Sequence, residues 1–531
     1  MGTLWYGGTI YTMDKENEQV EAVYTSNGVI QGVGPLTQLE QVFSSSIEQR
    51  IDLKGATMLP GLVDSHMHLI GLGEMLHRLD LSTCRSKKEL LTKVREKVNE
   101  TKDGEWIIGE GWNENLWADA DELTRWDLDP ITNIHPILLK RVCRHALVVN
   151  TVALNLCGIT EQTKEPFGGV IERKNGALSG VFKDDAQQLI FNRIPKASIA
   201  YLEDALKRAI EHCWKHGIVG GHTEDLSYYS GFKTTYQAFH HVIHESDYPF
   251  RAHLLVHHHV IDDWYKEGHT YLSGTPFIRF GAMKIFADGS LGGRTALLSV
   301  PYTDDPSTQG VAIHTLPELK ELVQKARKME LPVAIHTIGD LAFEYALEAI
   351  SACLPKNGQR DRLIHAQLLR EELIRKAQSL PVVLDIQPLF VASDFPWVLE
   401  RVNKNNIPYL YAWKTLLNAS IPCAGGSDAP IERVNPFHSI YTAITRKKPN
   451  EPSTAYLPEE ALTPYEAFRL YTVGSAYAAQ EENKRGCIKN GHVADFTIVN
   501  HDVMNVPPEQ LLNSEVVMTV VNEKIVYSRK Q

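Results

Sequence analysis

The sequence has no long apolar run, few cysteines and no excess of basic residues. No run approaches the roughly 20 apolar residues that span a bilayer, and residues 1–6 lack the basic and apolar segments of a signal peptide. Seven cysteines without CxxC spacing argue against a disulfide framework and fit a reducing compartment. Lys and Arg number 54 against 65 Asp and Glu, with no basic block, which disfavours nucleic acid as a partner. We therefore expect a cytoplasmic protein that binds neither membranes nor nucleic acid.

The two ends of the chain share one pattern of short strands. Residues 1–59 contain an Asn27-Gly28 hairpin signal, and a second hairpin is expected between 516–521 and 525–527. Because chain termini often lie close together, we expect residues 1–59 and 480–531 to form one small composite β-sandwich.

The middle of the chain alternates apolar segments of strand length with amphipathic helical segments. This α/β alternation predicts a (β/α)8 TIM barrel from residues 60–79 and 210–479. About 150 residues separate the first strand from the second, which predicts an inserted α+β domain at residues 80–209. The expected barrel strands are 62–68, 217–223, 251–257, 278–286, 331–337, 361–366, 381–387 and 421–427.

Histidines and one aspartate mark the ends of several of these strands. His66 and His68 are two residues apart on the first strand, so both imidazoles point the same way and offer half of a divalent-metal site. His336 and His365 end the fifth and sixth strands, and Asp428 follows the eighth. Because the carboxyl ends of barrel strands meet at one mouth, their joint placement predicts a metal centre, whereas any one of them alone fits a structural role.

Lys284 lies late in the fourth strand. A lysine ammonium is no ligand for a cation, but a lysine carboxylated by CO2 becomes a carbamate whose two oxygens can bridge two metal ions. The alternative is a barrel lysine paired with Asp288, which lies farther along on the same face if the strand stays regular. We favour the carbamate.

Further residues are candidates for substrate contacts or for orienting the ligands. Asp64 is expected either to orient a ligand histidine or to cap the strand end. His222, with Glu224 and Asp225, follows the second strand, where a solvated loop is the alternative. Trp112, in the insert with Trp117, is expected either to wall the mouth or to belong to a core.

A set of motifs resembles the amidohydrolase superfamily, in the branch of YtcJ-like proteins and N-substituted formamide deformylase, amidohydrolase family 3. The resemblance covers nearly the whole chain and implies a barrel with a composite β-sandwich, a mono- or binuclear metal site and hydrolysis of an amide-like bond. A segment that contains His145 also recurs in that family. For His145, a role in facing the substrate and a role in packing between domains are equally compatible with this resemblance. The motifs are LPGLVDSHMH at 59–68, KIFADGSLGGRTA at 284–296, AIHTIGD at 334–340, IHAQ at 364–367, GSDAP at 426–430 and ADF at 494–496.

The resemblance implies a division of the ligands between two ions, with Zn2+ the expected metal. His66, His68 and Asp428 would hold one ion, His336 and His365 the other, and carboxylated Lys284 would bridge them. Hydroxide generated on the metal would attack the substrate, while Asp428 accepts the proton of the water and returns it to the leaving nitrogen.

Two other readings stay open. One is a deaminase on the same barrel, with a single ion and no bridging lysine. The other is a barrel that has lost catalysis and serves as a scaffold, which the complete ligand set disfavours. The expected partner is a small-molecule substrate that the sequence does not identify, and a homodimer is compatible with the family.

Overall fold

The computed structural model describes residues 2–114, 117, 122–141, 146–166, 169–194, 197–452 and 454–529. The chain divides into two compact units, of which unit 1 joins residues 1–73 to residues 198–531 and unit 2 comprises residues 74–197. Unit 1 contains the barrel and the sheet built from both termini, and unit 2 has its own sheet and helices. The residue bounds expected for three separate domains stay predictions.

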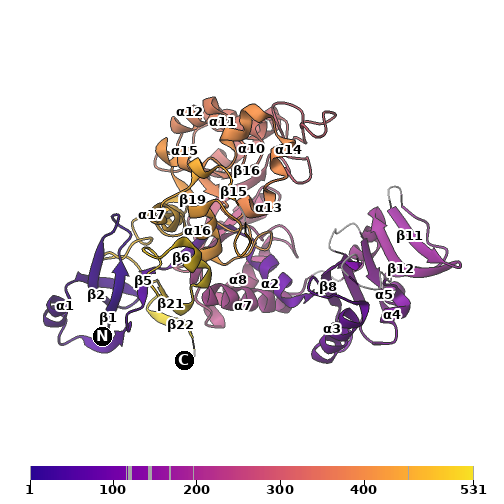
Figure 1. Cartoon of the computed structure of the whole chain (residues 1–531), viewed down its shortest axis with the longest axis horizontal. Coiled ribbons are helices and arrows are strands. Elements are labelled where there is room, and N and C mark those ends of the chain that lie inside the picture. The colour runs from indigo at the N-terminus through magenta and orange to yellow at the C-terminus, as the bar shows by residue number, and fades with distance from the viewer. Residues whose placement is uncertain are drawn as a thin grey trace. The chain divides into compact units, whose positions relative to one another are not determined.

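Unit 1 is built around a nearly closed barrel of eight parallel strands, which confirms the predicted barrel (Figure 1). The strands follow one another in sequence order around the sheet, as right-handed βα units do. At the seam between the first and last strands, the N–H of Asp428 donates to the carbonyl of His66 at 2.7 Å. Every strand begins and ends within two residues of its predicted bounds: β6 (Leu62–Met67), β13 (Ile218–Thr223), β14 (Arg251–His257), β15 (Ile278–Phe286), β16 (Val333–Thr337), β17 (Asp361–His365), β18 (Val382–Ile386) and β19 (Cys423–Gly425).

Helices connect the barrel strands, and their ends carry strong sequence signals. Helix α10 begins with a capping box in which Thr315 and Glu318 satisfy each other's backbone N–H groups. The helices of this unit are α2 (Leu69–His77, which runs into unit 2), α7 (Ile199–Lys215), α8 (Phe232–His240), α9 (Ile261–Lys266), α10 (Leu316–Lys328), α11 (Asp340–Ala352), α12 (Glu371–Gln378), α13 (Phe390–Asp394), α14 (Val398–Arg401), α15 (Trp413–Asn418), α16 (Pro436–Thr445), α17 (Pro464–Arg469) and α18 (Ser475–Ala478).

The last helical segment of the barrel is interrupted. Helix α17 passes into a π-helical turn at Leu470–Gly474 before α18 begins. A side chain at Gly474 would place its Cβ 2.3 Å from the carbonyl oxygen of Cys423. The helix therefore approaches β19 so closely that only glycine fits at this point.

Strands from both ends of the chain form the second sheet of unit 1, and in Figure 1 the indigo and yellow strands belong to it. Its order is β22-β21-β20-β5-β1-β2-β3, with β4 also paired to β1. Trp5 and Phe496 meet edge to face in its core, with ring centroids 5.5 Å apart. A two-layered sandwich stays a prediction. The elements are β1 (Gly2–Tyr11), β2 (Gln19–Ser26), β3 (Val29–Gly34), α1 (Leu36–Val42), β4 (Ile47–Asp52), β5 (Thr57–Pro60), β20 (Phe496–Val499), β21 (Val516–Val521) and β22 (Lys524–Ser528).

The hairpin predicted from Asn27-Gly28 joins β2 to β3. Asn27 and Gly28 have φ values of 54° and 74°, as a two-residue hairpin turn with both central residues in the left-handed region requires. The second predicted hairpin joins β21 to β22, where Asn522 and Glu523 have φ values of 53° and 70°.

The described residues of unit 2 form a six-stranded mixed sheet with helices on its faces. Hydrophobic clusters lie on both sides of the sheet, and Trp112 and Trp117 belong to one of them. The strand order is β11-β12-β10-β9-β8-β7. Its elements are β7 (Leu79–Asp80), α3 (Lys87–Glu100), β8 (Ile107–Trp112), α4 (Arg125–Leu128), β9 (Ile137–Arg141), β10 (Ala146–Val149), α5 (Thr151–Cys157), β11 (Gly169–Lys174), β12 (Ala177–Asp184) and α6 (Gln188–Phe191).

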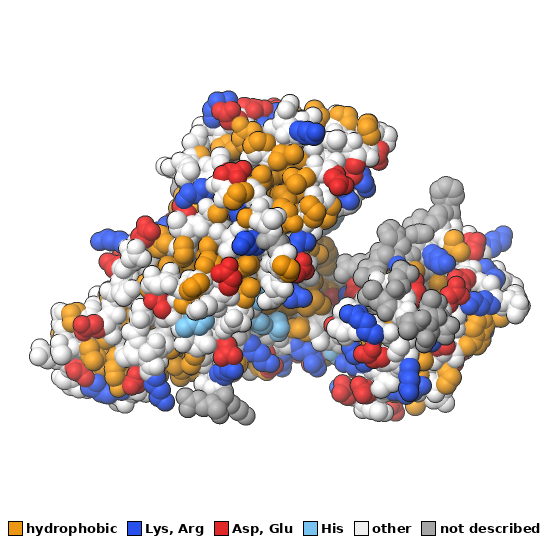
Figure 2. All heavy atoms as spheres, in the orientation of Figure 1, with side chains coloured by type: hydrophobic (Ala, Val, Ile, Leu, Met, Phe, Trp, Pro, Cys, Tyr) orange, Lys and Arg blue, Asp and Glu red, His pale blue; other side chains and the backbone are white. Residues whose placement is uncertain are grey.

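Acidic and basic side chains are interspersed on the face of the molecule shown in Figure 2. Across the described ranges, no helix combines the length and the apolar character that crossing a bilayer requires. The cysteines of the described part of the chain are free, as expected: Cys84, Cys157, Cys213, Cys353, Cys423 and Cys487.

Candidate metal centre

His66, His68 and Asp428 meet at the carboxyl end of the barrel. The Nε2 atoms of His66 and His68 lie 3.5 and 3.4 Å from one Asp428 carboxylate oxygen. One ligand atom from each of the three residues lies within 4.8 Å of the others, so the set can surround a metal ion. The two-residue spacing on β6 therefore brings both imidazoles to one side, as the strand geometry predicts.

The loop after β19 aims the carboxylate of Asp428 at these histidines. Asp428 has a φ of 56°, in the left-handed region that aspartate tolerates better than most residues. Asp64 fixes the same loop, because its carboxylate accepts the N–H of Ser427 at 3.0 Å and the N–H of His66 at 3.1 Å. Asp64 therefore binds the backbone across the barrel seam. Burial raises the pKa of this carboxyl to about 7.

His336 and His365 continue the cluster on the neighbouring side. Their ring centroids lie 4.5 Å apart, and the His365 ring lies 5.4 Å from the ring of His66. The arrangement thus brings together all four histidines predicted from the strand ends.

Hydrogen bonds outside the cluster orient three of these rings. His68 Nδ1 donates to the carbonyl of Glu224 at 2.8 Å, which leaves Nε2 free toward Asp428. His365 Nδ1 donates to the side-chain oxygen of Gln387 at 2.8 Å, and His336 Nε2 donates to the carbonyl of Gly289 at 2.9 Å. In its neutral form, each of these imidazoles offers its other nitrogen as a lone-pair donor, an arrangement typical of metal-ligating histidines.

Burial keeps most of the cluster in the neutral, metal-binding form. Desolvation, with the charge of Lys284 next, lowers the pKa of His336 to about 3 and the pKa of His66 well below its ordinary value. His68 differs: burial lowers its pKa, but the hydrogen bond to Asp428 and the nearby acidic charges outweigh burial and raise it to about 9. Without a metal, Asp428 therefore holds a proton on His68, and a divalent cation would take the place of that proton.

Lys284 lies inside the cluster. Its Nζ atom is 3.4 Å from His66 Nε2 and 4.7 Å from the centroid of the Phe286 ring, and the residue has no exposed surface. Burial lowers the pKa of this amine to about 8, although the charges of Glu224, Asp428 and Asp385 oppose that shift. The neutral form of this amine is therefore more populated near pH 7 than in an exposed lysine.

Asp288 is not the partner of Lys284, so the alternative of a Lys284–Asp288 pair is wrong. The Asp288 carboxylate accepts the N–H groups of Leu297, Ile338 and Gly339 at 2.7–3.0 Å. One of its oxygens also lies 3.5 Å from His336 Nε2. Asp288 thus ties the segment after β15 to the loop that follows β16.

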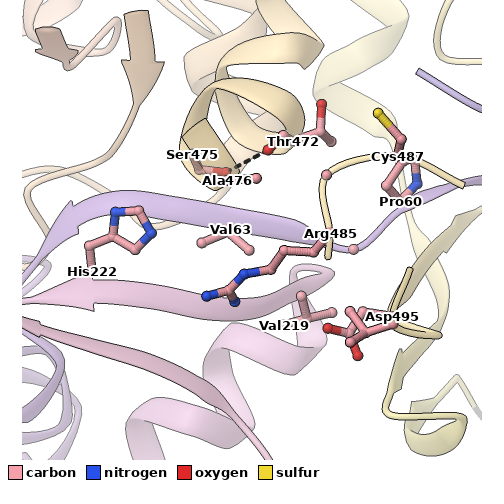
Figure 3. Close-up of a pocket in the computed structure, with 13 residues that line it drawn as sticks. Pro60, Val63, Val219, His222, Thr472, Ser475, Ala476, Arg485, Cys487 and Asp495 are labelled. Atoms are coloured by element: carbon pink, nitrogen blue, oxygen red, sulfur yellow. Dashed lines mark hydrogen bonds between the residues drawn. The ribbon is translucent and has the colours of Figure 1, made fainter. Parts of the chain in front are cut away.

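The other candidates lie apart from the cluster or outside the described residues. His222 points into an enclosed pocket with Arg485, lined by Val63 and Val219 near the beginnings of β6 and β13 (Figure 3). Its ring lies 4.8 Å from that of His253, and the charges that act on it are those of Arg362, His253 and Arg485. Trp112 is 5% exposed in the core of unit 2. His145 lies outside the described residues.

Tyr228 and Gln387 are site neighbours that the sequence did not indicate, and Glu224 was foreseen only as part of a loop. The Tyr228 ring lies 5.8 Å from that of His68, and its hydroxyl is hydrogen-bonded to the buried Glu224 carboxylate. Burial raises the pKa of Glu224 to about 7. Gln387 directly follows β18, so its strand-end position was an available signal, whereas the loop position of Tyr228 carried none.

The donor set fits divalent metal ions of the kind that accept imidazole and carboxylate together. Neutral imidazoles with one carboxylate suit Zn, Mn, Fe or Co. Lys284 lies beside the three-residue group, with Nζ 3.4 Å from His66 Nε2, and its charge also acts on His336 and His365. The geometry is therefore that of a site for activating water or a polar bond of a bound molecule.

Comparison with known proteins agrees with this geometry. The model of the Amidohydrolase family matches residues 49–527. The amidohydrolase YtcJ of Bacillus subtilis (strain 168) is 49% identical over 531 residues, covering 100% of both chains. The N-substituted formamide deformylase of Arthrobacter pascens is 25% identical over 547 residues, covering 98% of this chain and 97% of the deformylase.

A solved structure extends the similarity to the fold. The crystal structure of an uncharacterized metal-dependent hydrolase from Pyrococcus furiosus superposes with a TM-score of 0.81 at 26% identity, covering 95% of this chain and 100% of that one. The resemblance inferred from the strand-end motifs is confirmed, and this chain belongs to the amidohydrolase family.

Proposed function

We propose that this protein is a metal-dependent hydrolase that cleaves a non-peptide C–N bond, of the amide or formamide type, in a small molecule. One observation carries the proposal: a single carboxylate oxygen of Asp428 faces the Nε2 atoms of both His66 and His68. The name of the deformylase relative supports a formamide-like bond, and family membership supports hydrolysis.

The ligand set divides naturally into two groups. His66, His68 and Asp428 would hold one ion, and His336 with His365 would hold the other. Carboxylated Lys284 would bridge them, with Zn2+ as the proposed metal. When bound, such ions lower the pKa of water and polarise a carbonyl.

The protein's own groups would then manage the proton. Asp428 accepts a proton from the attacking water and returns it to the nitrogen that leaves, because one of its oxygens already lies at the centre of the cluster. Gln387 and the Glu224 carbonyl keep the His365 and His68 rings in the orientation that leaves the inward nitrogen unprotonated.

The test begins with His66→Ala and His68→Ala. Each removes an imidazole from the three-residue group, so we expect each variant to lose most of its metal and its turnover while the barrel stays folded. Elemental analysis reports the metal, circular dichroism reports the fold, and release of amine from N-formyl and N-acyl compounds reports turnover. His501→Ala, in the loop that follows β20, is the control and should keep wild-type metal.

Two results would refute the proposal. Wild-type metal content in both His66→Ala and His68→Ala would remove the ligand assignment. A structure of the metal-bound enzyme with a single ion beside an unmodified Lys284 would favour the deaminase-like mechanism with one ion.

A further inference from the structure

A second group of histidines lies beside the candidate metal centre and takes no part in it. His257 ends β14, and His258 and His259 follow it in a turn. One ring nitrogen from each of the three lies within 4.8 Å of the others. A strand would send consecutive side chains to opposite faces. The turn, closed by the N–H of Val260 donating to the His257 carbonyl at 3.0 Å, brings all three rings together instead.

A fourth histidine from a distant part of the chain joins this group. The ring of His314 lies 5.2 Å from that of His258, and the rings of His258 and His259 lie 4.1 Å apart. Nδ1 of His258 and Nε2 of His314 are buried, and within the described ranges neither has a hydrogen-bond partner of acceptable geometry. Buried polar nitrogens without partners are costly, and a metal ion would satisfy them.

The three histidines differ in exposure to solvent. His257 is buried, His258 is half-buried and His259 is exposed, so an ion can enter from solvent.

We propose that His257, His258 and His259, with His314 beside them, form an accessory site for a late first-row divalent ion such as Zn2+. All-imidazole donor sets suit Zn, Cu and Ni. Ligand nitrogens around a tetrahedral ion at about 2.0–2.1 Å lie about 3.4 Å apart. The ring nitrogens of His257, His258 and His259 lie within 4.8 Å of one another, so they must approach each other by up to about 1.4 Å when an ion binds. The exposed His259 has the freedom to make that movement.

The ion would compete with one existing hydrogen bond. Nδ1 of His257 accepts the N–H of His259 at 3.1 Å, so this nitrogen is unprotonated and presents a lone pair. Transfer of that lone pair to the ion frees the N–H of the exposed His259, where water can replace the partner.

Residues of β15 lie between the accessory site and the candidate metal centre and contact both. The N–H of His258 donates to the carbonyl of Lys284 at 3.0 Å. The His257 ring lies 5.7 Å from that of Phe286, which in turn lies 5.1 Å from that of His336. The site needs no ligand of the catalytic cluster, so it stands whether or not the proposed hydrolysis is correct.

The experiment compares the metal content of the full-length protein with that of His258→Gln/His259→Gln. Both proteins are dialysed against micromolar Zn2+ at pH 7 and washed, and zinc per chain is measured by elemental analysis. We expect the double variant to hold about one zinc fewer than the wild type. His259→Gln alone, at an exposed position that is safe for folding, should weaken Co2+ binding at this site by at least about tenfold, read from the visible absorption of Co2+.

The control is His240→Gln/His244→Gln, which removes another neighbouring histidine pair, with ring centroids 4.9 Å apart. Two ligands bind an ion less tightly than three or four, so this variant should keep the zinc content of the wild type. Equal zinc in the wild type and in His258→Gln/His259→Gln, with unchanged Co2+ affinity in His259→Gln, would overturn the proposal. Unchanged circular dichroism in each variant separates ligand loss from unfolding.

Discussion

A substitution at Asp428 can separate metal coordination from proton transfer. Asp428→Asn keeps the shape and one oxygen that can face His66 and His68, but an amide is a far poorer proton acceptor. We expect turnover to fall by about 10²- to 10⁴-fold, as for loss of a general base, and metal content to fall less than in His66→Ala. Steady-state kinetics and elemental analysis on one preparation measure both. Near-normal turnover would contradict the proton-transfer role.

Lys284 gives a prediction about pH because its pKa is lowered to about 8, first of all by burial. Carbamate formation needs the neutral amine. In metal-free protein at constant dissolved CO2, the reacting fraction rises about fivefold between pH 7 and 8 and less than twofold from pH 8 to 9, whereas an ordinary lysine at about 10.4 would keep gaining tenfold per unit. We expect recovery of activity after metal addition to follow this levelling curve.

Lys284→Ala is the control for that measurement. It lacks the amine, so its activity should stay near zero and should not respond to bicarbonate at any pH. A wild-type recovery rate independent of CO2 would argue that Lys284 acts unmodified.

At the scale of elements, the barrel seam depends on one side chain. Asp64, on β6, holds the N–H of Ser427 in the loop after β19 and the N–H of His66. Asp64→Ala leaves both buried N–H groups without a partner, at about 1–3 kcal/mol each. We expect a lower urea midpoint and metal affinity about 10- to 100-fold weaker. Asp64→Asn retains one acceptor and should lie between the two proteins in both measurements, whereas identical values for Asp64→Ala and the wild type would refute this role.

The strands and the metal-ligating candidates were predictable because one physical rule connects them. Parallel barrel strands are short apolar runs, and the polar residue that ends each run lies at a common mouth, so His66, His336 and His365 were found by position. What the sequence did not show depends on contacts between distant segments. The π-helical turn at Leu470–Gly474 lies so close to β19 that Gly474 has no room for a side chain, and Tyr228 approaches His68 from a loop that has no periodic pattern.

Two candidates that lie outside the metal cluster, Trp112 and His222, were harder to interpret. From the sequence, Trp112 was compatible with a wall of the barrel mouth and with a hydrophobic core. The structure places it in the core of unit 2. His222 has the same strand-end signal as the ligands, yet it points into the pocket shared with Arg485. The direction in which a strand-end side chain points depends on local twist and on register shifts, such as those between β6 and β13. Sequence spacing does not reveal these features.

At the scale of the molecule, a buried ion pair fastens the terminal sheet to the barrel. Arg251 on β14 makes two hydrogen bonds to Asp495, at 2.8 and 2.9 Å, and both side chains are buried. Asp495→Asn leaves the guanidinium buried without its counter-charge, so we expect destabilisation by about 3–5 kcal/mol, measured as an earlier urea transition. Arg251→Met/Asp495→Leu removes both charges and should recover most of the loss. A double variant as unstable as Asp495→Asn would contradict this account.

Strand β5 can complete its pairing in the terminal sheet only after the ribosome has synthesised β20. Leu59 lies opposite Thr497, about 440 residues later. At about 5–20 residues per second, the first strands wait for roughly half a minute or longer with one edge open, while the whole barrel and unit 2 emerge. An open strand edge is a template for pairing with other chains. Nascent chains of this protein should therefore depend on chaperones that shield that edge until synthesis is nearly complete.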